Sequence, residues 1–283
     1  MPVAKNIAIL CNPLAGVGKA ARLALQLSKE LQKVKVDYTV FDKEWPSDPG
    51  DFTEIWIAGG DGTLNYFVNH YPGIQIPFAI FKGGTGNDFH WLLYGNISLE
   101  HQLQLVLDTS PKPIDVGKCN EQYFLNGAGI GFEGSVVQSL LGKKKWAGKT
   151  SFYITVLKKI FFYRSQYYII THGDAIYKGN KLMVSVTNGR RAGGGFYISP
   201  EARADDGLLD IVLVDPLHPL KRLRYLPVIE KGKHLNLSFV THFTATHLNI
   251  TSDQLMHYHL DGEYCTANTI NIEIVKHRLR VLY

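Results

Sequence analysis

EIWIAGGDGTLNYF, at residues 54–67, is the stretch of this chain that decides its fold. An apolar run enters a turn made of Gly59, Gly60, Asp61 and Gly62, and an amphipathic run starts directly after it. The pattern predicts a buried strand, a tight turn and a helix. Because glycine lets backbone N–H groups approach a ligand and a helix N-terminus attracts anions, the turn also suits a phosphate group. A plain strand-to-helix turn is the alternative that this stretch alone leaves open.

The same order of strand, glycine-rich turn and helix occurs twice more in the first third of the chain. NIAILC at 6–11 runs into NPLAGVGK, and IPFAIF at 76–81 runs into KGGTGND. This repetition predicts an α/β domain with a mainly parallel sheet flanked by helices. Since ligands of such sheets bind beyond the carboxyl ends of the strands, we expect the three turns to converge there.

The first helix of this domain shows a clear periodicity. Leu23, Leu27, Leu31 and Val34 recur at spacings of three and four, so we expect them to share one buried face. We expect further helices at LNYFVNH and around LEHQLQLVLD.

The residue pattern of the sequence changes after about residue 115. Short β-like runs separated by turn residues predict a C-terminal antiparallel β-sandwich domain, with a helical insertion at 139–164. We place the α/β domain at 1–117 and the β-sandwich domain at 118–283. The pattern leaves open whether the last strand packs on the first domain or the second.

The bulk properties fit a globular protein with an anionic partner. The chain has 283 residues, enough for two domains, 45% hydrophobic residues and a formal net charge of +5. Its three cysteines are far apart and predict free thiols in a reducing compartment. We see no signal-peptide layout and no apolar run long enough to span a bilayer, so we expect a cytoplasmic location.

The acid at the centre of GGDGT has a chemical reason to lie in a phosphate-binding turn. Asp61 suits Mg²⁺ bridging it to phosphates, or an attacking hydroxyl that it orients. In the third turn, Thr85 and Asn87 place side-chain donors beside Gly84. A polar loop that ends in a helix cap is the alternative for that turn.

The first turn, CNPLAGVGKA, superficially suggests a P-loop. It fails as one because Pro13 and Ala20 stand where that motif requires Gly and Ser or Thr. Asn12 and Lys19 are still placed to contact a nucleotide.

Five motifs, in order, give the chain a family resemblance. NPLAGVGK, GGDGT, GGTGNDF, PEARADDGLLDI and LDGE together resemble the diacylglycerol kinase catalytic family, which includes bacterial lipid kinases and the sphingosine and ceramide kinases. GGDGT alone is shared with NAD kinases and phosphofructokinases, whereas the later motifs resemble those of the lipid kinases. The resemblance implies a nucleotide domain, a β-sandwich lipid domain, and ATP and Mg²⁺ as cofactors.

The resemblance also implies roles for particular residues. Asp61 matches a catalytic aspartate near the ATP phosphates, and Glu263 matches the general base that acts on the lipid hydroxyl. The ATP-binding positions are Asn12, Lys19, Gly59, Gly60, Gly62, Thr63, Gly84, Thr85 and Asn87. The metal-binding positions are Asp205, Asp206 and the backbone of Leu208. The family commonly continues with Ala-Arg after NDF; here His90 follows, and we do not give it the role of that arginine.

Two of these assignments have alternatives in the sequence itself. Asp-Gly is a favoured hairpin turn, so Glu263 could merely flank one. Adjacent acids before a strand are an ordinary exposed turn, and Asp205 and Asp206 would need a cation only if they were buried.

Two further patterns carry no site. GIGFEG at 129–134 matches Gly-x-Gly-x-x-Gly, but no acid follows at the distance a ribose partner requires, so we interpret it as a packed strand end. His257 and His259 alternate on a strand without a third ligand at metal spacing, so we assign no zinc site.

A basic and aromatic segment suggests a membrane partner. Residues 135–173 contain no Asp or Glu. Their basic residues are Lys143, Lys144, Lys145, Lys149, Lys158, Lys159 and Arg164. With six interleaved aromatic residues, the part at 143–164 suits an anionic membrane surface. The alternatives are a solvated helical hairpin and a nucleic-acid patch, although we expect no nucleic acid.

The sequence therefore predicts an ATP- and Mg²⁺-dependent lipid kinase that phosphorylates a hydroxyl of a membrane lipid such as diacylglycerol, acting peripherally at the inner face of the membrane. A soluble NAD kinase-like enzyme and a catalytically weak lipid- or nucleotide-binding regulator are the alternatives. Phosphatidylglycerol, a sphingoid base and undecaprenol-like alcohols stay open as substrates, and so does a homo-oligomer.

Overall fold

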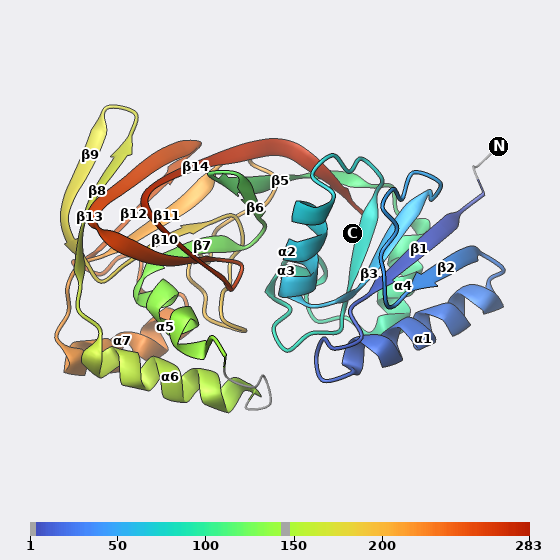
Figure 1. Cartoon of the computed structure of the whole chain (residues 1–283), viewed down its shortest axis with the longest axis horizontal. Helices are drawn as coiled ribbons and strands as arrows, with labels where there is room; N and C mark the ends of the chain where they lie inside the picture. Colours follow the sequence, from blue (N-terminus) through green and yellow to red (C-terminus); the bar gives the residue numbers. More distant parts are fainter. Residues whose placement is uncertain (1–3, 143–147) are drawn as a thin grey trace. The chain divides into compact units, whose positions relative to one another are not determined.

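The computed structural model describes residues 4–142 and 148–283. The chain divides into two compact units. The first is Met1–Ile114 together with His277–Tyr283, and the second is Asp115–Lys276. The chain thus leaves the first unit after Ile114 and returns to it for its last residues (Figure 1).

The first unit is built on a parallel sheet, as the alternating pattern predicts (Figure 1). Its strands are β1 (Asn6–Cys11), β2 (Asp37–Phe41), β3 (Glu54–Gly59), β4 (Phe78–Lys82) and the end of β14 (Glu263–Val281). They are ordered β14-β4-β3-β1-β2. β1, β3 and β4 are buried along almost their whole length, which explains their unbroken apolar sequences.

β2 is the strand that the sequence pattern does not predict. It pairs in parallel with β1 at the edge of the sheet, and three of its five residues are exposed. Because an edge strand buries little surface, DYTVF needs no continuous apolar run and gives only a weak signal.

Helices flank this sheet, and all but α3 begin near places expected from the sequence. They are α1 (Lys19–Lys33), α2 (Asp61–His70), α3 (Asp88–Tyr94) and α4 (Leu99–Asp108). Leu27 and Leu31 lie on the buried face of α1 with Ala20 and Ala24. The prediction that Val34 shares this face is wrong, because the helix ends one residue earlier and Val34, its C-cap, is 53% exposed.

The second unit is rich in antiparallel strands. One series pairs in the order β12-β11-β10-β7-β13-β14, while β5 pairs with β6 and with β14, and β8 pairs with β9 and with β13. The bounds are β5 (Lys112–Cys119), β6 (Gln122–Phe124), β7 (Gly127–Gly131), β8 (Gln166–His172), β9 (Ala175–Lys181), β10 (Met183–Thr187), β11 (Leu209–Val214), β12 (Val240–Ala245) and β13 (His247–Leu260).

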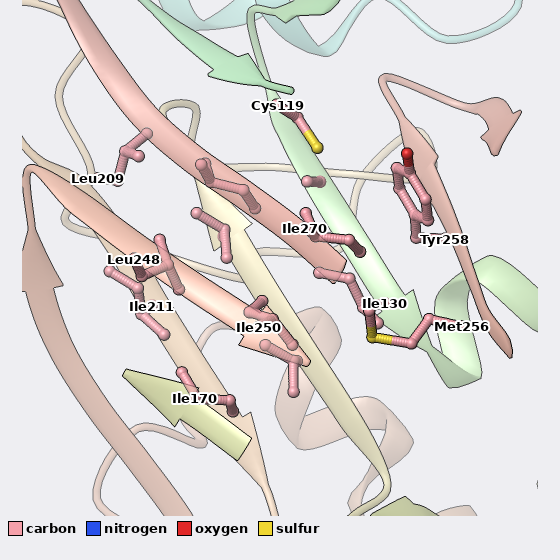
Figure 2. Close-up of a cluster of buried hydrophobic side chains, with 14 of the residues drawn as sticks. Cys119, Ile130, Ile170, Leu209, Ile211, Leu248, Ile250, Met256, Tyr258 and Ile270 are labelled. Carbon is pink, nitrogen blue, oxygen red and sulfur yellow. The ribbon is translucent and has the colours of Figure 1, made fainter. Parts of the chain in front are cut away.

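The long strand β13 holds the core of this unit together. It pairs with β8 near Ile250 and with β7 near Tyr258, and its register with β14 shifts between Thr251 and Met256. Figure 2 shows that side chains from both halves of β13 join the same buried apolar cluster as Ile130 of β7. This arrangement makes a sandwich-like core from two groups of strands.

Helices α5 (Phe132–Leu140), α6 (Gly148–Phe162) and α7 (Pro219–Glu230) complete the second unit (Figure 1). α6 lies within the predicted helical insertion. Arg222 of α7 donates through Nη1 to the carbonyls of Ile160 (3.0 Å) and Tyr163 (2.8 Å), and so holds α7 at the end of α6. Across residues 4–142 and 148–283, no helix combines the length and the apolar character needed to cross a membrane.

Candidate active site

The three glycine-rich turns of the first unit pack directly against one another. A Cβ on Gly16 would lie 2.2 Å from the carbonyl oxygen of Gly83, and a Cβ on Gly60 would lie 2.8 Å from Cα of Gly84. Only residues without a side chain allow the turns after β1, β3 and β4 to come this close. The predicted convergence of these turns at the carboxyl edge of the sheet is therefore confirmed.

The turn after β1 has an unusual backbone. Gly16, Val17 and Gly18 all have positive φ, at 58°, 57° and 81°. For the β-branched Val17 this conformation is strained, and such strain often marks a functional loop. Asn12 starts the turn by accepting the Leu14 N–H at its Oδ1 (3.1 Å). A turn of this kind directly before a helix N-terminus is suited to surround an anion with backbone N–H groups.

The carboxylate of Asp61 lies where two of these turns meet. Its Oδ2 accepts the N–H of Asp88 and its Oδ1 accepts the N–H of Phe89, both at 3.0 Å. These bonds fix Asp61 to the start of α3 and satisfy two N–H groups of that short helix. A carboxylate oxygen can accept from more than one group at a time, so a carboxylate held in this way is chemically suited to a cation or a hydroxyl as well.

The remaining predicted nucleotide residues of this unit differ in their surroundings. Asn87 closes its own turn, with Gly84 N–H donating to Oδ1 (3.0 Å) and Nδ2 donating to the Gly84 carbonyl (3.1 Å). Thr85 and Lys19 are exposed. Thr63 is buried against Gly59: a Cβ added at Gly59 would lie 2.5 Å from the Cβ of Thr63. The side chain of Thr63 therefore supports the turn from inside.

His90 has a structural role. It is buried, and its Nε2 lies 3.0 Å from Oε1 of Gln102, whose Nε2 donates to the carbonyl of Ile80 at 2.8 Å. Burial lowers the pKa of this imidazole. His90 thus connects α3 to α4 and β4 as a core residue.

In the second unit, Glu263 lies directly after a tight hairpin turn. Leu260 of β13 pairs with Glu263 of β14, and Asp261 and Gly262 between them have φ values of 51° and 94°. Two central residues with positive φ are typical of the two-residue turn that joins antiparallel strands. Glu263, the first residue of β14, is exposed, so its carboxylate is accessible.

Asp261 fixes this turn to the neighbouring strand connection. Its carboxylate accepts three backbone N–H groups, from Leu125 (2.7 Å), Asn126 (2.8 Å) and Gly127 (3.0 Å). Bonds to an ionised acceptor are stronger than neutral ones, and three of them define the position of the turn. The sequence had singled out Glu263 in LDGE, but it gave no reason to expect this clamp.

The two acids of the DDG segment, Asp205 and Asp206, are exposed and not buried. Asp205 pairs with Arg203 at 3.1 Å, and Oδ1 of Asp206 accepts the N–H of Leu208 at 3.0 Å. Because both acids contact solvent, the argument that a buried pair would require a cation does not apply to them.

A residue that sequence reasoning missed lies behind this segment. Asp115 is fully buried, and its Oδ2 accepts the N–H of Gly207 at 2.7 Å. Asn188 then donates to the carbonyls of both Asp115 and Leu125 at 3.1 Å, and Leu125 is held by Asp261. Hydrogen bonds therefore connect the DDG segment to the LDGE turn. The signal was present, since PIDVG places one acid within an apolar run.

The oxygen donors in these segments fit a magnesium ion. Mg²⁺ is usually bound by one or two carboxylates and several waters, and Asp61, Asp205 and Asp206 each supply a carboxylate of this kind. In the part of the chain that the structure describes, no three His, Cys, Asp or Glu side chains gather as a ready metal-binding group. A magnesium ion at Asp61, or one at the DDG segment, would thus depend on water or phosphate for most of its ligands.

The GIGFEG segment is a packed strand end, as predicted. β7 is buried at every residue, and a Cβ on Gly134 would lie 2.1 Å from the carbonyl oxygen of His257. Beside it, Glu133 accepts the Ser185 hydroxyl at 2.8 Å, and desolvation raises the pKa of this carboxyl to about 7. Desolvation also lowers the pKa of the neighbouring His259 to about 4.

Comparison with known proteins places the chain in a class and then in a family. An α/β unit with three glycine-rich loops and an antiparallel β unit define a two-domain kinase. Residues 6–119 match the family described as the diacylglycerol kinase catalytic domain, and residues 128–283 match the YegS C-terminal NAD kinase beta sandwich-like domain. The chain therefore belongs to the diacylglycerol kinase family of lipid kinases, which confirms the resemblance seen in its motifs.

Individual relatives agree with this placement. A diacylglycerol kinase of Bacillus subtilis is 27% identical over 220 residues, covering 76% of this chain and 72% of its own. One of Mycobacterium tuberculosis is 27% identical over 295 residues, covering 98% and 94%. The crystal structure of a diacylglycerol kinase from Bacillus anthracis superposes with a TM-score of 0.75 at 25% identity, covering 100% of this chain and 98% of that one.

Proposed function

We propose that this protein is an ATP-dependent lipid kinase that transfers the γ-phosphate of ATP to a hydroxyl of a membrane lipid such as diacylglycerol. The observation that carries the proposal is the mutual packing of the three glycine-rich turns, two of which meet at the Asp61 carboxylate. Backbone N–H groups at converging turns favour polyphosphates, and phosphoryl transfer depends mainly on such positioning.

The acceptor side of the reaction needs a base, and Glu263 is the residue we assign. In the reaction, the lipid hydroxyl gives its proton to the Glu263 carboxylate and its oxygen forms a bond to the γ-phosphorus. The bond from that phosphorus to the bridging oxygen breaks, and ADP leaves. Magnesium, bound with the help of Asp61, would neutralise phosphate charge. The segment around Asp205, Asp206 and Leu208 is the second candidate for holding a metal.

Peripheral contact with an anionic membrane would bring the enzyme to its substrate at the inner face of the membrane. On α6, the side chains of Ile154, Leu157, Phe161 and Phe162 are 42–82% exposed, and Lys158 on the same surface is exposed as well. Exposed apolar and basic side chains on one helix suit the interface of an anionic bilayer. The predicted contacts of Lys143, Lys144 and Lys145 lie outside the described residues.

Transfer of labelled phosphate from ATP into a total lipid extract tests the proposal directly. We expect one labelled lipid, whose identity is read from its mass, and no label with the Glu263→Gln variant. NAD is included as a second acceptor, because the C-terminal match carries an NAD kinase description. Label in NADP instead of lipid would establish the NAD kinase alternative, and nucleotide binding without any turnover would indicate a regulator.

A further inference from the structure

Two sequence patterns that the reaction leaves unexplained meet at one place in the second unit. Gly129 belongs to the GIGFEG segment, and His259 is one of the two alternating histidines of β13. These residues are register partners across β7 and β13, and Ser185 of β10 is the register partner of Gly129 on its other side. The three residues therefore form a row across three neighbouring strands.

This row lies on the face of the sheet that points away from the buried apolar cluster. Tyr258 of β13 points into that cluster (Figure 2), so its neighbour His259 points the other way. The same holds for Ile130 and its neighbour Gly129 on β7. Helix α5 packs on β7 and β13 and brings the side chain of Glu133 over Gly129.

The missing side chain of Gly129 leaves room for two polar groups. A Cβ on Gly129 would lie 2.2 Å from Oε2 of Glu133 and 2.5 Å from Nε2 of His259. Both atoms thus lie over the same glycine, and any larger residue would displace them. Oε2 of Glu133 also accepts the Ser185 hydroxyl at 2.8 Å. The close packing of the GIGFEG segment therefore brings a carboxyl group beside one nitrogen of the imidazole.

The other nitrogen of this imidazole is bonded to the turn that precedes Glu263. The N–H of Gly262 donates to Nδ1 of His259 at 3.2 Å. A nitrogen that accepts carries no proton, so in the neutral ring the proton is on Nε2, the atom beside the Glu133 carboxyl. Desolvation lowers the pKa of His259 to about 4, so the ring is neutral at pH 7.

We propose that His259 is a positioning residue for Glu263, the general base that we assign to the reaction. Its Nδ1 holds the Gly262 amide and so fixes the residue directly before Glu263, while the Glu133 carboxyl favours the tautomer in which Nδ1 is the acceptor. The Asp261 carboxylate fixes the position of the same turn, but it makes no contact with this amide. The inference rests on the proposed function, since it takes Glu263 to be the base.

Asparagine, glutamine and leucine at position 259 separate the acceptor from packing. Asn has an oxygen at the position of Nδ1, Gln has its amide at the position of Nε2, and Leu has no acceptor. We expect His259→Leu and His259→Gln to lower kcat about tenfold with an unchanged KM for ATP, because a small displacement of a catalytic group is costly. His259→Asn should restore most of the loss. His247→Leu, exposed at the other end of β13, is the control and should change neither quantity.

The ¹⁵N chemical shifts of the His259 imidazole test the contact without any turnover. In the parent protein at pH 7 we expect a proton on Nε2 and none on Nδ1. In Glu133→Leu, which removes the carboxyl beside Nε2, the shifts should move towards a mixture of the two tautomers.

The outcomes distinguish this inference from the proposed function. In an active kinase, an unchanged kcat in His259→Leu, an equal loss in His259→Leu and His259→Asn, or a parent imidazole protonated on Nδ1 would overturn the positioning role alone. A parent protein that transfers no phosphate to lipid would overturn the proposed function and the positioning role with it.

Discussion

Glu263 depends on its local backbone for any catalytic role. The Asp261–Gly262 turn sets where β14 begins, and the three N–H groups bound by Asp261 set where that turn lies. The side chain of Glu263 itself is exposed. Its substitution should therefore change chemistry with little effect on folding.

Glu263→Gln is expected to lower kcat by about 10²- to 10⁴-fold, because an amide cannot accept the proton of the lipid hydroxyl. The KM for ATP should stay unchanged, since the turns that we propose for ATP binding belong to the other unit. Steady-state kinetics with a lipid hydroxyl acceptor measure both quantities. An unchanged kcat would exclude Glu263 as the base.

Asp261→Asn tests the hydrogen bonds of the Asp261 carboxylate separately from the conformation of the turn. Asn-Gly suits the same hairpin turn, but the amide is uncharged, and its NH₂ group in place of Oδ2 cannot accept the N–H of Leu125. We expect a loss of about 1–3 kcal/mol in the free energy of unfolding, measured in urea, together with a lower kcat. Asp174→Asn, in the exposed hairpin between β8 and β9, is the control and should have neither effect.

Glu133 makes the stability of the second unit depend on pH in a direction that its pKa determines. Its folded-state pKa of about 7 lies above the ordinary value of 4.5, so the folded state favours the neutral acid. The stability that this provides is fully present below pH 4.5 and is lost as pH rises through 7. The free energy of unfolding of Glu133→Gln, relative to that of the parent protein, should therefore rise as the pH is raised from 5 to 8, by on the order of 2 kcal/mol.

Urea unfolding at three pH values in that range measures this difference. His259, whose pKa is lowered to about 4, works in the opposite direction, since its contribution is lost as pH falls from 6.5 towards 4. His259 is present in both the parent protein and the variant, so its contribution largely cancels in the difference between their stabilities. Glu121→Gln, at an exposed side chain, serves as the control. A difference that does not vary with pH would contradict the raised pKa.

At the scale of elements, strands with strong periodicity were predictable and supporting residues were not. EIWIAG and the helix after it follow from local sequence, because burial of a whole strand needs an unbroken apolar run. β2 was missed because an edge strand buries one side of a few residues. Asp115 and the Asp261 clamp were missed because their partners are up to 136 residues away, and no local pattern encodes such contacts.

The exposed face of α6 leads to a prediction about membranes. Phe161 and Phe162 are 46% and 82% exposed, so replacing both with serine should leave the unit folded. We expect the double variant to bind vesicles of phosphatidylglycerol and phosphatidylcholine about tenfold more weakly, because insertion of apolar side chains contributes to interfacial binding. Flotation measures the bound fraction. Leu25→Ser, at an exposed residue of α1, is the control, and equal binding of all three proteins would exclude α6 as the contact.

At the scale of the whole molecule, the path of the chain makes the first unit dependent on its last residues. The return segment His277–Tyr283 includes Leu279, Val281 and Leu282, all buried. Leu282 donates its N–H to the carbonyl of Phe78 at 2.9 Å, and its carbonyl accepts the Tyr94 hydroxyl at 2.6 Å. Residues that follow the second unit in sequence thus complete the sheet of the first.

Removal of residues 277–283 should consequently destabilise the first unit and spare the second. Three buried apolar side chains are lost, which corresponds to on the order of 5 kcal/mol, a large part of the stability of a small domain. Hydrogen exchange should show lost amide protection in β1, β3 and β4, and retained protection in β7 and β10. Tyr94→Phe removes one hydrogen bond and should cost only about 1 kcal/mol. Equal loss of protection in both units would mean that they unfold as one cooperative body and that the return segment has no special role in the first.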